Sequence, residues 1–258
     1  MSVDRHLWIG TSWKMNKTYA GAMVFAMALR RAEAPPDVAF TRFVVPPFTV
    51  LREVAEVLSE TGVVVGAQNA HWEDAGAWTG EVSVPMVADC GATLVELGHS
   101  ERRTHFGETD ETVGKKVGAV LRHGLKPLVC VGETRAEKDA GQTAEVLERQ
   151  VRAALSGAHA GDHVLFAYEP VWAIGEGGEP ASPAYAADYH DQIAAMAKDI
   201  LGTPPPVLYG GSVTAENCTA YLAERAVGGL FIGRAAWQIE GYLDILSRAA
   251  TLMRENEE

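Results

Sequence analysis

The stretch KPLVCVGETRAEKDAGQTAEVLERQVRAALSGAHAGDHVLFAYEP, residues 126–170, carries the pattern that decides the fold. It begins with KPLVCVGE (126–133) and ends with HVLFAYEP (163–170), two short apolar runs of the kind required of strands buried on both faces. Between them, AEVLERQVRAALSG (144–157) has apolar residues at three- and four-residue spacing and ends at a glycine, which predicts an amphipathic helix. The stretch therefore predicts a strand, a helix and a second, parallel strand.

The same alternation extends along the whole chain. Further helices are predicted in AGAMVFAMALRRAEA (20–34) and AYAADYHDQIAAMAKDILG (184–202), the second with Ser182 and Pro183 as cap and first-turn residues. The predicted strands are LWIGTSW (7–13), FTRFVVPP (40–47), GVVVGAQN (62–69), TLVELGH (93–99), KPLVCVGE (126–133), HVLFAYEP (163–170), PVLYGGSV (206–213) and GGLFIGR (228–234).

Eight such units predict an α/β fold, a single closed (β/α)8 barrel domain over residues 1–258. An open doubly wound sheet is the alternative. That fold usually has a glycine-rich first turn, whereas the first turn here is TSWKMNKT (11–18), without GxGxxG.

The composition excludes several classes of partner. The chain has 34 Asp and Glu against 22 Lys and Arg, a formal charge of −12, so we expect no nucleic-acid partner. Its three cysteines lie far apart and no His or Cys spacing suits a metal, so we expect reduced thiols, no metal and a cytoplasmic location. No run of about 18 apolar residues occurs, and we expect no membrane association.

The predicted strand ends carry chemically useful side chains. In a barrel, the functional site lies at the carboxyl ends of the strands, where we find Lys14, His99 and Glu169. Glycine-rich turns at 210–212 and at Gly233 could bring backbone N–H groups close to a phosphate. A cation, an imidazole, a carboxylate and an anion-binding turn together favour proton abstraction beside a carbonyl in a phosphorylated substrate.

Four motifs then resemble the triosephosphate isomerase family across essentially the whole chain: WKMN (13–16), ELGHSERR (96–103), AYEPVWAIG (167–175) and YGGSV (209–213). The resemblance implies a TIM barrel and an isomerase that needs no cofactor. It implies that Glu169 is the general base, that His99 is the electrophile that moves protons between the oxygens, and that Lys14 neutralises negative charge.

The resemblance implies further roles around these three residues. Ser100 and Glu101 would position the histidine and the lysine, residues 170–175 would form a closing lid, and the phosphate contacts would come from Gly175, Ser212 and Gly233. The long loop QNAHWEDAGAWTGEVS (68–83) would join two subunits of a homodimer. Its Thr79 would lie beside the partner's lysine, and Trp72 or Trp78 would be buried at the contact.

Two positions depart from the family's pattern. Ser12 stands where the family usually has an Asn that contacts the substrate, and Arg234 replaces the second glycine of a Gly-Gly pair. The smaller Ser12 would make room for a larger substrate, and Arg234 would add a cation to the phosphate site. The stretches TSWKMNKT (11–18), GAQNAHWEDAGAWTGE (66–81) and LFIGRAAW (230–237) resemble the branch of the family that converts L-erythrulose 1-phosphate into D-erythrulose 4-phosphate.

Other functions are also compatible with this sequence. An ordinary triosephosphate isomerase acting on dihydroxyacetone phosphate would tolerate both departures, and another phosphosugar isomerase or lyase is compatible with the fold. A catalytically dead barrel that serves as a binding protein is a further class. We interpret the Arg102–Arg103 pair as charge on a helix surface.

Overall fold

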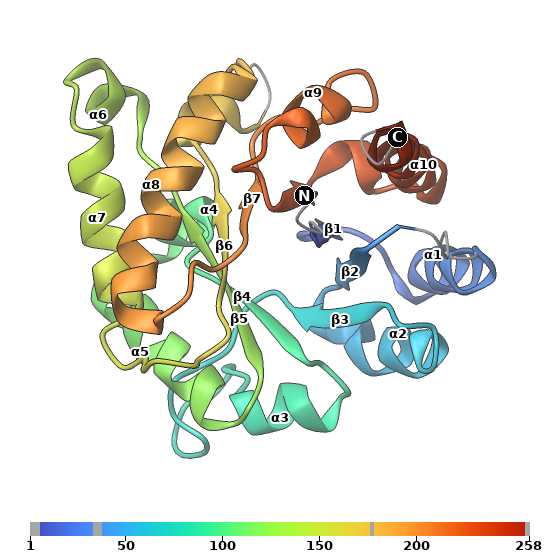
Figure 1. Cartoon of the computed structure of the whole chain (residues 1–258). Helices are drawn as coiled ribbons and strands as arrows, with labels where there is room; N and C mark the ends of the chain where they lie inside the picture. Colours follow the sequence, from blue (N-terminus) through green and yellow to red (C-terminus); the bar gives the residue numbers. More distant parts are fainter. Residues whose placement is uncertain (1–5, 33–37, 176–177, 256–258) are drawn as a thin grey trace.

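The computed structural model describes residues 6–32, 38–175 and 178–255. Its centre is a closed barrel in which every strand is parallel to its neighbours and the strands follow one another in sequence order (Figure 1). The strands are β1 (Leu7–Ser12), β2 (Phe40–Val45), β3 (Val64–Ala67), β4 (Leu94–Leu97), β5 (Lys126–Val131), β6 (Leu165–Tyr168), β7 (Val207–Tyr209) and β8 (Gly229–Ile232). The barrel closes where β1 pairs with both β2 and β8.

Helices lie around the outside of this barrel (Figure 1). They are α1 (Tyr19–Arg31), α2 (Leu51–Leu58), α3 (Val84–Asp89), α4 (Ser100–Phe106), α5 (Asp110–Arg122), α6 (Arg135–Asp139), α7 (Thr143–Ala154), α8 (Pro183–Leu201), α9 (Cys218–Ala223) and α10 (Ile239–Glu255). Within the described residues, short 3-10 helices lie in the connections: η1 (Phe48–Val50), η2 (Val171–Ala173) and η3 (Arg234–Ala236). No helix of the described ranges is long and apolar enough to cross a membrane.

The prediction of a (β/α)8 barrel is confirmed, and each of the eight predicted apolar runs contains one strand. Helix α8 begins as predicted, because the Ser182 side chain accepts a hydrogen bond from the Tyr185 backbone N–H and Pro183 occupies the first turn. The predicted helix at 20–34 corresponds to α1, and residues 33 and 34 lie outside the described residues.

Alternation along the strands separates two apolar layers. The larger layer lies between the strands and the helices, while a smaller cluster fills the barrel itself and includes Phe43, Leu94, Leu128 and Phe231. The ring of Phe43 fits because β1 has a glycine opposite it: a Cβ on Gly10 would lie 2.3 Å from that ring. The barrel is therefore a packed core with its open site at one end.

Candidate active site

A cavity of about 330 Å³ lies at the carboxyl ends of the strands. Eight of the residues that the sequence predicts for the site line it together: Ser12, Lys14, His99, Glu169, Gly175, Ser212, Gly233 and Arg234. Ser100 and Glu101 are absent from the lining. They form the first turn of α4, directly after the histidine. The fold thus brings residues from β1, β4, β6, β7 and β8 to one place.

His99 is held in a defined tautomer by the start of α4. Its Nδ1 accepts a hydrogen bond of 3.1 Å from the backbone N–H of Glu101, so this nitrogen carries no proton. The imidazole proton is then on Nε2, which points toward the cavity and lies 3.6 Å from Oε1 of Glu169. The ring therefore presents a neutral N–H donor to whatever occupies the cavity.

Glu169 follows β6 and is almost fully buried. Its backbone N–H donates to the Val131 carbonyl at 2.7 Å, which fixes the residue against the end of β5. Gly210 leaves room for the side chain, because a Cβ there would lie 2.7 Å from Glu169 Cγ. Among the described residues, Glu169 Oε2 has no hydrogen-bond partner. A buried carboxylate with an available oxygen is suited to accept a proton.

Lys14 follows β1 with a left-handed backbone, φ 51°, a conformation that is strained for a residue with a side chain. The Gln68 side chain supports this turn by donating to the Lys14 carbonyl at 2.9 Å. Lys14 Nζ donates to Glu101 Oε1 at 2.8 Å. Burial lowers the pKa of Lys14, but the hydrogen bond to Glu101 and the nearby carboxylates outweigh it, so the pKa is raised and the side chain stays cationic.

The side of the cavity predicted to bind phosphate is lined by the turns after β7 and β8 and by Ile174 and Gly175 of the predicted lid, residues 170–175. The Ser212 hydroxyl and backbone N–H both donate to the Ala173 carbonyl, at 2.7 and 3.0 Å. Arg234 begins η3, the short helix after β8, and lines the same cavity. These contacts tie the predicted lid directly to the turn that carries Ser212.

A buried glutamate at the end of β5 anchors the predicted lid. Glu133 accepts hydrogen bonds from Trp172 Nε1 at 2.7 Å and from the hydroxyls of Tyr168 and Tyr185. Its carbonyl also accepts from the Val171 N–H at 2.9 Å. Glu133 is not among the site residues predicted from the sequence. Its position as the last residue of the predicted strand 126–133 is the feature that could have indicated it.

A second carboxyl that the sequence analysis missed lies inside the barrel. Glu96 is 3% exposed and shares the inward face of β4 with Leu94. The Ser12 hydroxyl donates to its Oε2 at 2.8 Å. Burial raises the pKa of Glu96 to about 7, with Glu169 adding to the rise while His99, Ser12 and Lys14 oppose it.

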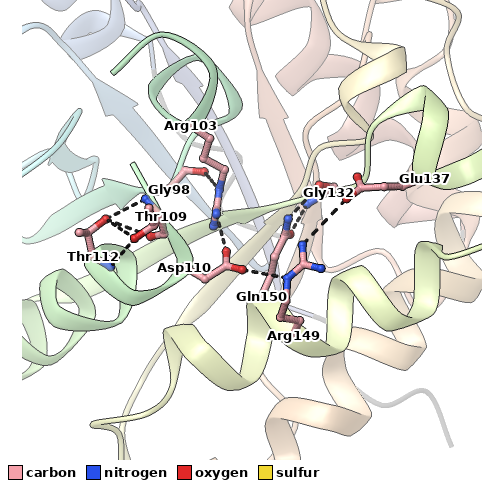
Figure 2. A network of polar contacts seen from close by, with 9 residues as sticks. All are labelled: Gly98, Arg103, Thr109, Asp110, Thr112, Gly132, Glu137, Arg149 and Gln150. Atoms are coloured by element: carbon pink, nitrogen blue, oxygen red, sulfur yellow. Dashed lines mark hydrogen bonds and ion pairs between the residues drawn. The ribbon is translucent and has the colours of Figure 1, made fainter. Parts of the chain in front are cut away.

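The turns after β4 and β5 are held by a polar network (Figure 2). Arg103 donates to the Gly98 carbonyl at 2.8 Å, just before the histidine, and pairs with Asp110, which also binds Arg149. The Gln150 side chain accepts a hydrogen bond from the Gly132 backbone N–H at 2.8 Å and donates one to the Gly132 carbonyl at 3.1 Å. The interpretation of Arg103 as plain surface charge is therefore wrong, because its guanidinium supports the turn that carries His99.

The loop 68–83 protrudes with its own aromatic cluster. The ring of His71 stacks on Trp72 at 4.1 Å and contacts Trp78 at 4.5 Å. Trp78 is 47% exposed, and Thr79 is also exposed. The loop is thus ordered around His71 and presents an aromatic side chain to its surroundings.

The chain is similar to several known proteins. The family model for triosephosphate isomerase matches residues 7–249. The chain is 56% identical over 257 residues to a Rhizobium rhizogenes protein named L-erythrulose-1-phosphate isomerase, covering 98% of each chain. It is 58% identical over 252 residues to a Brucella abortus protein of the same name, covering 96% of this chain and 98% of the relative. A Mesorhizobium japonicum protein of that name is 55% identical over 246 residues, covering 94% and 97%.

Proposed function

Since the chain belongs to the triosephosphate isomerase family, we propose that it interconverts L-erythrulose 1-phosphate and D-erythrulose 4-phosphate by proton transfer through an enediolate. The observation that carries the chemistry is that Glu169, whose Oε2 has no partner among the described residues, and His99, whose Nε2 lies 3.6 Å from Glu169 Oε1, share one cavity. The relatives' shared name supports the four-carbon substrate and argues against the three-carbon, glycolytic alternative.

In this mechanism Glu169 removes the proton from C3 of L-erythrulose 1-phosphate. The electron pair moves into a C2–C3 double bond, and the C2 carbonyl oxygen gains negative charge. The Nε2–H of His99 donates to that oxygen, and the Lys14 cation stabilises the charge. As the C2 oxygen takes the Nε2 proton of His99, the C3 hydroxyl gives its own proton back to Nε2 and becomes the carbonyl, while Glu169 returns its proton to C2. Atoms and charge balance within substrate and site, so no cofactor is required.

The phosphate group would lie against Gly175, Ser212, Gly233 and Arg234. Ser212 currently uses its hydroxyl and N–H on the Ala173 carbonyl, so phosphate binding would exchange those bonds as the lid rearranges. Closing the lid would exclude water and strengthen the electrostatic stabilisation of the enediolate.

A homodimer is the proposed assembly, with the loop 68–83 docking on a second copy. Exposed Trp78 supplies an aromatic contact. Met15, 97% exposed next to Lys14, offers an apolar surface where the loop of the partner subunit would lie. Thr79 would then approach the lysine of the other subunit. A reducing cytoplasm is the proposed location, in keeping with three cysteines that are all free.

The function is tested by incubating the purified protein with L-erythrulose 1-phosphate in deuterium oxide. The proposal requires D-erythrulose 4-phosphate to form, with deuterium at the carbon that receives the proton in each turnover in which the Glu169 proton exchanges with solvent first. The Glu169→Gln variant is the matched control, since it keeps the shape of the side chain and removes its basicity. Wild-type turnover in the Glu169→Gln variant would reject proton transfer by Glu169, and no product from the wild-type protein would reject this substrate.

A further inference from the structure

We propose that Ser12 and Glu96 together recognise a hydroxyl group of the substrate: Glu96 accepts a hydrogen bond from the Ser12 hydroxyl, so that Ser12 Oγ faces the cavity as a hydrogen-bond acceptor. The inference rests on the proposed function and names the residues that recognise the fourth carbon. Neither the resemblance nor the relatives assign a role to Glu96.

The pair joins two strands that are not neighbours in the barrel. Strand β1 pairs with β2 and β8, and β4 pairs with β3 and β5, yet Ser12 Oγ lies 2.8 Å from Glu96 Oε2. The bond therefore crosses the barrel interior. Ser12 lines the cavity, whereas Glu96 is absent from the lining and lies buried among the inward-facing residues. Ser12 is thus the link between the cavity and the buried carboxyl.

The donor and acceptor groups of the Ser12 hydroxyl determine which kind of hydrogen bond it can offer to the cavity. A hydroxyl has one proton to donate and two lone pairs that accept. Because the proton is committed to Glu96, Ser12 offers acceptor lone pairs to the cavity. The Ser12 carbonyl is also held, since Trp237 Nε1 donates to it at 2.9 Å. An asparagine at this position would instead offer N–H donors.

The cost of burying Glu96 supports a specific role. Leu94, which shares its inward face, shows that an apolar side chain fits this interior. A buried carboxyl is expensive unless it is well bonded, and Glu169 close by adds repulsion. His99 and Lys14 are the facing groups that favour its charge, and the Ser12 hydroxyl is its hydrogen-bond donor.

An acceptor at this point distinguishes the two candidate substrates. In L-erythrulose 1-phosphate the carbon that loses its proton, C3, carries a hydroxymethyl group. The corresponding carbon of dihydroxyacetone phosphate carries a second hydrogen in place of that group. A hydroxymethyl O–H can donate to Ser12 Oγ, and the three-carbon substrate has no such group there. Losing the acceptor should therefore slow the four-carbon reaction and leave the three-carbon reaction nearly unchanged.

The experiment compares kcat/KM for three substrates: L-erythrulose 1-phosphate, its 4-deoxy analogue and dihydroxyacetone phosphate. The wild-type protein should prefer the hydroxyl-bearing four-carbon substrate to the 4-deoxy analogue by about tenfold, the value of one good hydrogen bond. Ser12→Ala should abolish that preference. Thr11→Val is the matched control, because Thr11 is buried on the same strand and its hydroxyl has no partner among the described residues.

Glu96→Met tests the second half of the pair, because it keeps an unbranched side chain without an acceptor. It should lower the preference for the hydroxyl by less than Ser12→Ala does, because the freed Ser12 hydroxyl can still accept but is no longer oriented, and adding it to Ser12→Ala should change the preference no further. An equal loss on all three substrates, or additive losses in the double variant, would overturn the inference. If Glu96→Met does not fold, the Ser12→Ala comparison still decides: an unchanged preference refutes the role of the pair. Absence of wild-type turnover on L-erythrulose 1-phosphate would instead reject the proposed function.

Discussion

His99 Nε2 lies 3.6 Å from Glu169 Oε1, although β4 and β6 are separated in the barrel by β5. The backbone N–H of Glu101 fixes the proton on Nε2, and Gly210 leaves the space that the glutamate occupies. A proton acceptor and a proton donor therefore face the same small volume, which is the arrangement that an enediolate reaction requires.

The role of the base gives the first prediction. Glu169→Gln should lower kcat by about 10²–10⁴-fold, since the amide keeps the shape and removes the basicity. Binding of a phosphate-bearing competitive inhibitor, measured by calorimetry, should stay within about threefold of wild type. Near-normal turnover in the Gln variant would remove Glu169 from this role.

The space around Glu169 gives the second prediction. In Gly210→Ala the new Cβ would lie 2.7 Å from Glu169 Cγ, so the carboxylate must shift. A displacement near 1 Å can cost about 100-fold in rate, and we expect kcat to fall by at least tenfold while the fold is retained. Gly118→Ala, in helix α5 with open space around the new methyl, is the control and should leave kcat unchanged. Equal kcat values for the two variants would contradict the proposed positioning.

The buried Glu96 carboxyl makes stability depend on pH. Its pKa is raised from 4.5 to about 7 in the folded protein, so the folded state keeps a proton that the unfolded chain has released. This contribution is fully present below pH 4.5 and is lost as the pH rises to 7, a change of about 3 kcal/mol in the free energy of unfolding.

Glu96→Met removes this titration. Urea unfolding at pH 5, 6, 7 and 8 should show the variant gaining stability relative to wild type up to about pH 7 and holding a constant difference above it. Parallel stability curves across that range would show that Glu96 keeps its ordinary pKa.

The proposed dimer gives the fourth prediction. Trp78→Asp should weaken self-association and lower activity at micromolar protein, because a charge replaces an aromatic contact. Val24→Asp, at an exposed apolar residue of α1, is the surface control. Sedimentation velocity provides the measurement. A wild-type protein that is monomeric and fully active at micromolar concentration would defeat the proposal.

The parts of the fold and site that depend on local sequence pattern could be predicted from the sequence. Continuous apolar runs identified every strand, and strand-end chemistry identified Lys14, His99 and Glu169, because parallel strands place their carboxyl ends at one edge. The Ser182 cap of α8 was predictable for the same local reason.

Contacts between distant residues were not accessible in this way. Glu96 stands inside the apolar run of β4, where nothing local marks it as functional, and its partner Ser12 lies 84 positions away across the barrel. The sequence alone predicts surface charge at Arg103, whereas in the fold its guanidinium donates a hydrogen bond to the Gly98 carbonyl. The Ser12–Glu96 contact depends on barrel closure, which no local spacing encodes, whereas the Arg103–Gly98 contact is local and depends on how the turn before α4 folds.

The substrate is the central claim, and one measurement tests it most directly: kcat/KM of the wild-type protein for L-erythrulose 1-phosphate and for dihydroxyacetone phosphate under the same conditions. In a fitted pocket, one added group of this size changes kcat/KM by roughly 10–200-fold. We therefore predict a preference of that order for the four-carbon substrate. A preference of similar size for dihydroxyacetone phosphate would show that the protein is a triosephosphate isomerase in activity, and that Ser12 does not enlarge the substrate range.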